Sequence, residues 1–148
     1  MRRYQRHKFA GEIEVQLRQL CELDNWHGPL AVLEDYLILA LLIGLPYLLG
    51  GEQYSVGWWL IYACLTVPLV GTRMRALATI LHESAHTTLA RSRTLNFFLG
   101  TYASGYLIMH GWHPYRDSHV KHHHGQFGDE LNDPDLRFQI EQSNYKPQ

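Results

Sequence analysis

The residues of this chain that could do chemistry are mostly histidines, and their first group is His82-Glu83-Ser84-Ala85-His86. Residues four apart share one face of a helix, so both imidazoles can bind one metal ion. The stretch 74–90 has neither proline nor glycine, which predicts a helix that carries this group. Taken alone, the His-Glu-x-x-His pattern is typical of zinc proteases, in which the glutamate is the general base.

The second group is His119-Val120-Lys121-His122-His123, which is followed directly by His124. We expect a helix over residues 113–124 to carry it. On a helix, positions i, i+3 and i+4 converge, so His119, His122 and His123 would ligate together while His124 points away. An alternative register uses His119 with His123 and His124. A histidine cluster of this kind is also found on pH-sensitive or adventitious metal-binding surfaces.

The two groups together offer five or six neutral imidazoles. A tetrahedral zinc site takes four ligands when it is structural and fewer from the protein when it is catalytic. Imidazole is also a suitable ligand for iron. Two metal ions held jointly by both groups are therefore the natural inference.

Two apolar stretches precede the first histidine group and predict a helical hairpin through a membrane. The stretch 29–49 carries two charges, both acidic and near its start, and spans about 31 Å as a helix, close to the ~30 Å of a hydrocarbon core. The stretch 54–70 has no charge, and its aromatic residues cluster near one end, as interfacial aromatics do. A pair of core helices in a soluble protein is the alternative, although such helices seldom run this long without charge.

Basic residues flank this hairpin on both sides and are missing from the turn between its two stretches. They precede it at Arg2, Arg3, Arg6, Lys8 and Arg18, and they follow it at Arg73 and Arg75. The positive-inside rule then places both ends of the hairpin in the cytoplasm. Before the hairpin, residues 11–24 have apolar positions at helical spacing, which predicts an amphipathic helix on the membrane surface or packed on the rest of the protein.

A third apolar stretch, residues 95–112, has basic residues on both flanks and several glycines within it. We expect a re-entrant or interfacial segment there rather than a full span. Such a segment keeps both histidine groups on one side of the membrane. The expected fold is therefore all-α, with an integral-membrane helical hairpin followed by cytoplasmic-side helices that carry the histidines.

Charge and cysteine content exclude other classes of protein. The formal net charge of −1 argues against nucleic-acid binding, which usually requires a strong basic excess. The two cysteines, Cys21 and Cys64, lie far apart and form no Cys-x-x-Cys pattern, so neither a disulfide framework nor a cysteine-based redox or zinc site is expected.

The two histidine groups, with Asp133-Pro134-Asp135 downstream, resemble the first two histidine boxes of the membrane fatty acid desaturase family, whose members are non-haem di-iron enzymes. The segments HESAHTTLARSRTLNFFLG and YRDSHVKHHHGQFGDELNDPDL carry the resemblance, and the apolar hairpin before the first box agrees with it. The resemblance covers residues 11–140, nearly the whole chain. Carotenoid ketolases, sterol-type hydroxylases and alkane hydroxylases share the same histidine-box pattern.

The resemblance implies a site and an activity. It makes iron ligands of five residues, namely His82, His86, His119, His122 and His123. It also implies that two non-haem iron ions activate O2 and introduce a double bond into a fatty acyl chain, with electrons from ferredoxin or cytochrome b5.

Neighbouring polar residues are further candidates. Glu83 occupies a position that is often Asp in the family, and with Asp117 and Asp129 it is a candidate for hydrogen bonding to a ligand imidazole. His124 is a candidate extra ligand. His110 and His113 flank Trp112 before the second box, and either could be an extra ligand or an ordinary interfacial histidine.

The family has a third histidine box after a second hairpin, and residues 1–148 contain neither. We therefore expect a single partial domain, the N-terminal portion of a desaturase, whose ligand set is incomplete as written. It is either a fragment or a truncated gene product, and the alternative is a metal site that another chain completes. The alternatives to a desaturase are a related di-iron hydroxylase or ketolase of lipids or carotenoids, a membrane zinc protease that uses the first box, and a non-catalytic remnant.

Overall fold

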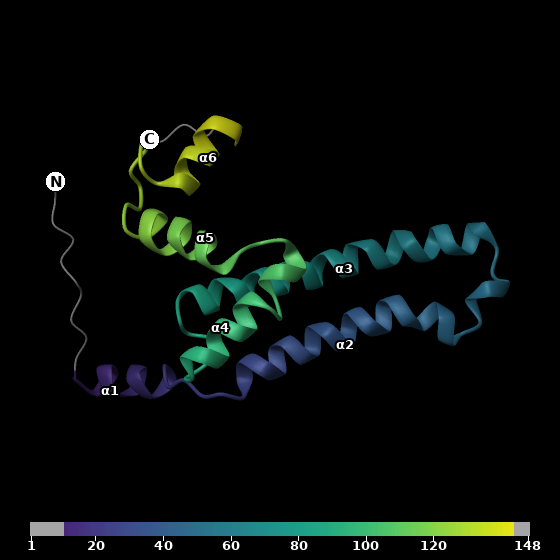
Figure 1. Ribbon diagram of the computed structural model, residues 1–148, viewed down its shortest axis with the longest axis horizontal. Coiled ribbons are helices and arrows are strands. Elements are labelled where there is room, and N and C mark those ends of the chain that lie inside the picture. The colour runs from purple at the N-terminus through teal and green to yellow at the C-terminus, as the bar shows by residue number, and fades with distance from the viewer. Residues whose placement is uncertain (1–10, 144–148) are drawn as a thin grey trace.

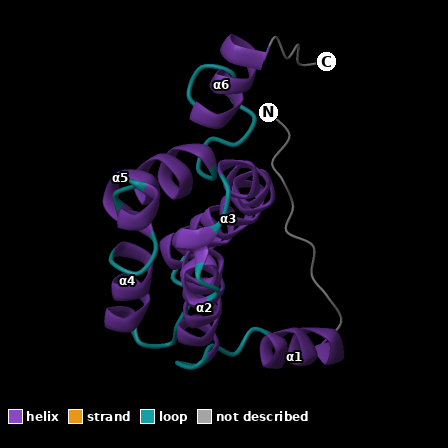
Figure 2. Ribbon diagram, turned by 90° about the vertical axis from the view of Figure 1, so that its right-hand side faces the viewer, coloured by secondary structure: helices purple, strands orange, loops and turns teal. Residues whose placement is uncertain are grey.

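The computed structural model of the chain describes residues 11–143, apart from the side chains of Arg18 and Glu52. These residues form helices and no strand (Figure 2), which confirms the predicted all-α fold. Four of the basic residues used to predict the orientation of the hairpin, namely Arg2, Arg3, Arg6 and Lys8, lie outside this range.

The longest elements form a helical hairpin. Helix α2 (His27–Leu48) and helix α3 (Val56–Ala85) run side by side and are joined by the short 3-10 turn η1 (Gly51–Gln53), as Figure 1 shows. Both helices are long and apolar enough to cross a membrane, yet only 17% of the most apolar window of each is buried. Core helices of a soluble protein would be mostly buried. The outward faces instead expose large apolar side chains, among them Leu33, Leu37, Leu41, Ile43, Leu60, Ile61, Leu65 and Val67.

The structure corrects the predicted boundaries of α3. We predicted a span at 54–70 and a separate histidine-box helix at 74–90, but one helix of 30 residues covers both and contains Pro68. A single glycine such as Gly71 weakens a helix by about 1 kcal/mol without ending it. At about 45 Å, α3 is longer than the ~30 Å hydrocarbon core, so it can span a membrane and still extend beyond it. It ends at Ala85 rather than at residue 90, because Thr87 adopts a left-handed conformation with φ 63°.

A buried ion pair joins α2 to α3. The Asp35 side chain, only 6% exposed, accepts a hydrogen bond from Arg73 Nη1 at 3.1 Å. A buried carboxylate is costly unless it is paired, so this contact aligns the two helices in the half of α2 that lies away from the turn.

Helix α1 (Gly11–Leu20) is shorter than the predicted 11–24. Its apolar residues Ile13, Leu17 and Leu20 are exposed, so α1 does not bury this face against the described part of the chain. Asp24 stabilises the start of α2, because its carboxylate accepts hydrogen bonds from the backbone N–H groups of Trp26 and His27.

The predicted segment 95–112 is not one continuous element. It consists of helix α4 (Arg93–Thr101), a 3-10 turn η2 (Gly105–Ile108) and the start of helix α5 (Trp112–Arg116). The predicted helix 113–124 is α5 followed directly by a π-helical segment, η3 (Asp117–His123). Helix α6 (Pro134–Ser143) packs on η3. Helices α4, α5 and α6 lie at the end of the hairpin opposite its turn (Figure 1).

A buried polar network joins three of these helices around Ser84, which has no exposed surface. The Ser84 hydroxyl donates to the Asn96 carbonyl at 2.7 Å and accepts the indole N–H of Trp112 at 2.9 Å. The Asn96 amide donates to the Ser84 carbonyl at 2.8 Å and accepts the N–H of Leu89 at 3.1 Å. Buried polar groups are costly unless they are hydrogen-bonded, so this network favours one arrangement of α3, α4 and α5.

Gly100 of α4 allows this close approach, because an added Cβ would lie 2.0 Å from the Ser84 Oγ. We predict that Gly100→Ala separates α4 from α3 and lowers the free energy of unfolding by about 1–3 kcal/mol, as overpacking does. Thermal unfolding of the detergent-purified protein measures this loss. Gly44→Ala is the matched control, since nothing lies within 4 Å of its added Cβ. Equal stability of the two variants would contradict the packing account.

Candidate metal centre

The first histidine box lies where α3 ends. His82 belongs to the last turn of the helix, and His86 is its C-cap residue, with its backbone N–H bonded to the His82 carbonyl at 3.2 Å. Because the helical geometry holds through this turn, the two imidazoles lie on one face with ring centroids 4.8 Å apart.

The second box reaches the first through His119. The imidazole of His119 lies 4.4 Å from that of His82 and 5.2 Å from that of His86, centroid to centroid. Potential ligand atoms of these three residues all lie within 4.8 Å of one another, and so do those of His119, His123 and His124. His119 therefore belongs to both groups and joins the two boxes into one cluster.

The π-helical segment η3 determines which histidines of the second box converge. The N–H of His124 bonds to the carbonyl of His119 at 3.0 Å, five residues back, and the Nε2 atoms of the two side chains are 3.1 Å apart. A π-turn contains one more residue than an α-turn, so positions i+4 and i+5, here His123 and His124, come onto the face that i+3 and i+4 occupy in an α-helix. His122 is exposed and belongs to neither group. Of the two predicted registers, the structure brings together His119 with His123 and His124.

The environment of the cluster lowers the pKa of two of its histidines, His119 and His86. Burial, and then the neighbouring His82, His124 and His86, lower the pKa of His119 to about 4. Burial and the same kind of neighbours also lower the pKa of His86. Neutral imidazole is the form that ligates metal, so near pH 7 these two residues are ready to bind without first losing a proton. Convergent neutral nitrogens suit iron or zinc.

The other predicted residues take different roles. Glu83 accepts a hydrogen bond from the Thr88 hydroxyl at 2.7 Å, Asp117 pairs with Lys121, and Asp129 accepts the backbone N–H groups of residues 131 and 132. None of these acids has a recorded hydrogen bond to a clustered histidine. His113 lies against Trp112 with ring centroids 5.0 Å apart, and His110 lies 5.9 Å from Tyr115.

Two supporting residues were missed in the sequence. The Tyr115 hydroxyl is 3.1 Å from His82 Nδ1, and its ring stacks on His119 with centroids 5.3 Å apart. Its position four residues before His119 was a usable signal, because such residues share a helix face. The second is Asp133, whose Oδ1 is 2.7 Å from His123 Nδ1. Burial alone would raise the pKa of Asp133, but hydrogen bonds from His123 and from backbone N–H groups outweigh it and lower the pKa to about 2.

A cavity of about 420 Å³ opens beside His82 between α3, η2 and α5. Arg75, Thr79 and Glu83 line it from α3, and Tyr115 lines it from α5. Its volume lies within the range of small-molecule sites, and it reaches the histidine cluster directly.

These features define a class of protein, namely a helical protein with a histidine cluster, able to hold metal, at one end of an apolar hairpin. The profile of the family described as "Fatty acid desaturase" matches residues 57–146, which include both boxes. The chain is also 38% identical over 136 residues to a dihydrorhizobitoxine desaturase of Bradyrhizobium elkanii. That alignment covers 92% of this chain and 36% of the relative's length. No solved structure shows a significant match. The chain belongs to the fatty acid desaturase family, as its boxes predicted.

The π-helical register gives a direct prediction. His124→Ala should weaken Co²⁺ binding by roughly tenfold or more. Removal of a residue that only hydrogen-bonds to a metal-binding histidine already lowers metal affinity by about that factor, and His124 is proposed to bind the metal itself. His122→Ala should leave the affinity near that of the wild type. Titration of the detergent-purified protein against a competing chelator measures both constants. The reverse order of the two losses would show that the metal-bound protein uses the α-helical register instead.

Proposed function

We propose that this chain provides part of the di-iron centre of an O2-dependent desaturase. His82, His86, His119 and His123 are ligands in this proposal, and His124 completes the set by its geometry. The observation that carries the proposal is the sharing of His119 by two histidine groups that come from separate helices. A single-box site, as in a zinc protease, would not need the second group, and the family match favours the desaturase.

Iron bound at this cluster would supply O2 activation and removal of two hydrogens from adjacent carbons. In the overall reaction the substrate gives two hydrogens, the donor gives two electrons, two protons are taken up, and O2 is reduced to two waters. Ferredoxin or cytochrome b5 is the proposed class of donor. A hydroxylase or ketolase would use the same cluster and differ in the product.

The residues of this chain prepare the site for such a centre. The cluster presents imidazoles whose low pKa keeps His86 and His119 neutral. Tyr115 engages His82 at Nδ1, which leaves Nε2 of that ring to face a metal. The cavity beside His82 provides a route by which substrate carbons approach the cluster.

We also propose that α2 and α3 span the membrane with the boxes on the cytoplasmic side. The exposed apolar faces of the two helices support the first part. The second part rests on charge, because Arg73, Arg75, Arg91 and Arg93 lie toward the box end of the hairpin while the turn 50–53 has no lysine or arginine.

The proposed substrate is a fatty acyl lipid, as the family name implies. The relative from Bradyrhizobium elkanii is named for a different compound, dihydrorhizobitoxine. The acyl chain is therefore the part of the proposal that needs a substrate panel, in which acyl lipids and dihydrorhizobitoxine are compared directly.

We predict that the desaturase whose centre includes this chain, purified in detergent and loaded with iron, forms a double bond in one member of this panel only when O2 and a reduced donor are present. His86→Ala should abolish the product, because it removes a ligand from the His82 group. Mass spectrometry detects the loss of two hydrogens, and metal analysis gives the iron content. An active protein that contains zinc and no iron, or a protein that binds no metal, would contradict the proposal.

A further inference from the structure

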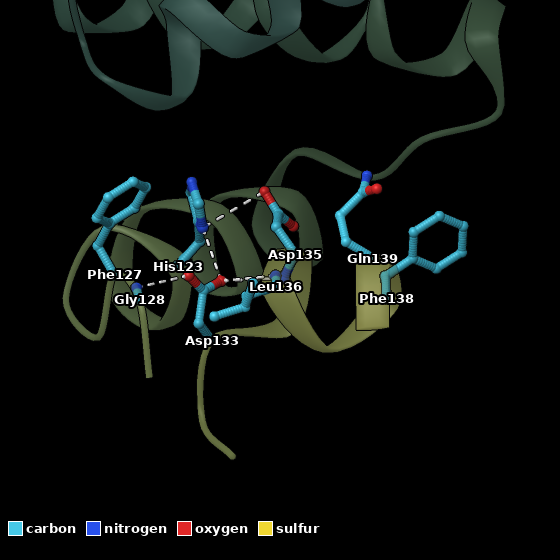
Figure 3. Close-up of a pocket in the computed structure, with 8 residues that line it drawn as sticks. All are labelled: His123, Phe127, Gly128, Asp133, Asp135, Leu136, Phe138 and Gln139. Carbon is cyan, nitrogen blue, oxygen red and sulfur yellow. Dashed lines mark hydrogen bonds and ion pairs between the residues drawn. The ribbon is translucent and has the colours of Figure 1, made fainter. Parts of the chain in front are cut away.

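The Asp133 carboxylate is held in a buried position beside the second histidine box. Its side chain is 1% exposed, and its Oδ1 lies 2.7 Å from His123 Nδ1. Figure 3 shows the two side chains directed at one another, with the Phe127 ring beside the His123 ring. The ring centroids of His123 and Phe127 are 5.3 Å apart, so the imidazole is confined by an aromatic ring and by a carboxylate.

Backbone groups determine the position of this carboxylate. Oδ2 accepts the N–H of Gly128 at 3.0 Å, and Oδ1 accepts the N–H groups of Asp135 and Leu136 at 3.0 and 3.3 Å. Asp133 is thus the N-cap of α6, and Pro134 occupies the first helical position, where a missing N–H costs nothing. Because α6 and the loop at Gly128 both hold it, the carboxylate has little freedom to follow His123.

This arrangement has a chemical consequence for His123. A carboxylate accepts hydrogen bonds only, so the Nδ1 atom that faces it carries the proton. The proton on Nδ1 leaves the lone pair on Nε2, the other ring nitrogen, which is then the atom free to bind metal. A histidine ligand is commonly oriented in this way by an acceptor on its second nitrogen.

We propose that Asp133 is the positioning residue of His123, which fixes the tautomer and the ring orientation of that ligand by anchoring it to the start of α6. The inference rests on the proposed metal centre. Asp135 is a weaker partner, since its Oδ2 is 3.5 Å from His123 Nδ1 and its side chain is 56% exposed, where water screens the charge. Glu83, Asp117 and Asp129 have no such contact, so Asp133 takes the place predicted for them.

Two substitutions separate this role from simple capping. Asp133→Ser keeps a good N-cap for α6 but removes the carboxylate from His123. Asp133→Asn keeps the size of the side chain but has only one oxygen. That oxygen can accept a hydrogen bond from either His123 or the Gly128 N–H, and the amide NH2 then faces the remaining N–H donor without an acceptor. Both variants should bind Co²⁺ about 10–100-fold more weakly than the wild type.

Asp129→Asn is the matched control. Asp129 lies in the same loop, accepts the backbone N–H groups of Leu131 and Asn132, and has no recorded contact with a histidine. Its substitution should leave Co²⁺ affinity unchanged. Circular dichroism in detergent shows whether each variant is folded, and Asp133→Ser provides the test if Asp133→Asn unfolds.

A double-mutant cycle identifies the residue through which Asp133 acts. In a His123→Ala background, Asp133→Ser should cost no further Co²⁺ affinity, because the ligand that it positions is gone. An equal loss in both backgrounds would show a general structural role and overturn the inference. Wild-type affinity in Asp133→Ser would overturn it as well, while the metal centre would stand. Absence of metal binding by the wild type would instead refute the proposed centre, and this inference with it.

Discussion

The arrangement of the site depends on the hydrogen bonds of one buried serine. Ser84 lies between His82 and His86, and its hydroxyl is bonded to Asn96 of α4 and to Trp112 at the start of α5. A second contact strengthens the link, since Arg116 Nε donates to the Ala85 carbonyl at 3.1 Å. Because α5 continues directly into the segment that carries His119, these bonds determine the distance between the two boxes. Loss of Asn96 or Trp112 as a partner of Ser84 would leave a buried polar group without a hydrogen bond, which lowers the free energy of unfolding by about 1–3 kcal/mol. The same hydrogen bonds therefore stabilise the fold and hold the two boxes together.

The long helix α3 explains why a site of this kind lies at the end of an apolar hairpin. Its first part exposes apolar side chains, and its last turn carries the first box. One continuous helix therefore links the apolar surface to the first box, with no loop between them. The Asp35–Arg73 pair then holds α2 against α3 near the point where the apolar surface ends. The histidine cluster is thereby held at one end of the proposed membrane span.

Much of this architecture follows from local sequence patterns. The apolar runs that form α2 and the first part of α3 were predicted because length and lack of charge are strong signals, and the first box was placed on a helix because residues 74–85 contain no breaker. The register of the second box was not determined, because an α-turn and a π-turn place His122 and His124 differently and the sequence favours neither. Asp133 and Ser84 were missed for another reason. Their partners become neighbours only after α6 and α4 fold back onto the boxes, and no spacing along the chain reports such a contact.

The central claim is that both boxes form a single cluster through His119. Metal content per chain, measured after loading and desalting of the detergent-purified protein, tests it directly in His119→Ala beside the control His113→Ala. His113 is exposed and lies outside both groups, so its substitution should leave the metal content at the wild-type level. We predict that His119→Ala loses metal from both groups at once. Wild-type metal content in His119→Ala, or loss from one group alone, would show that the boxes bind independently and would contradict it.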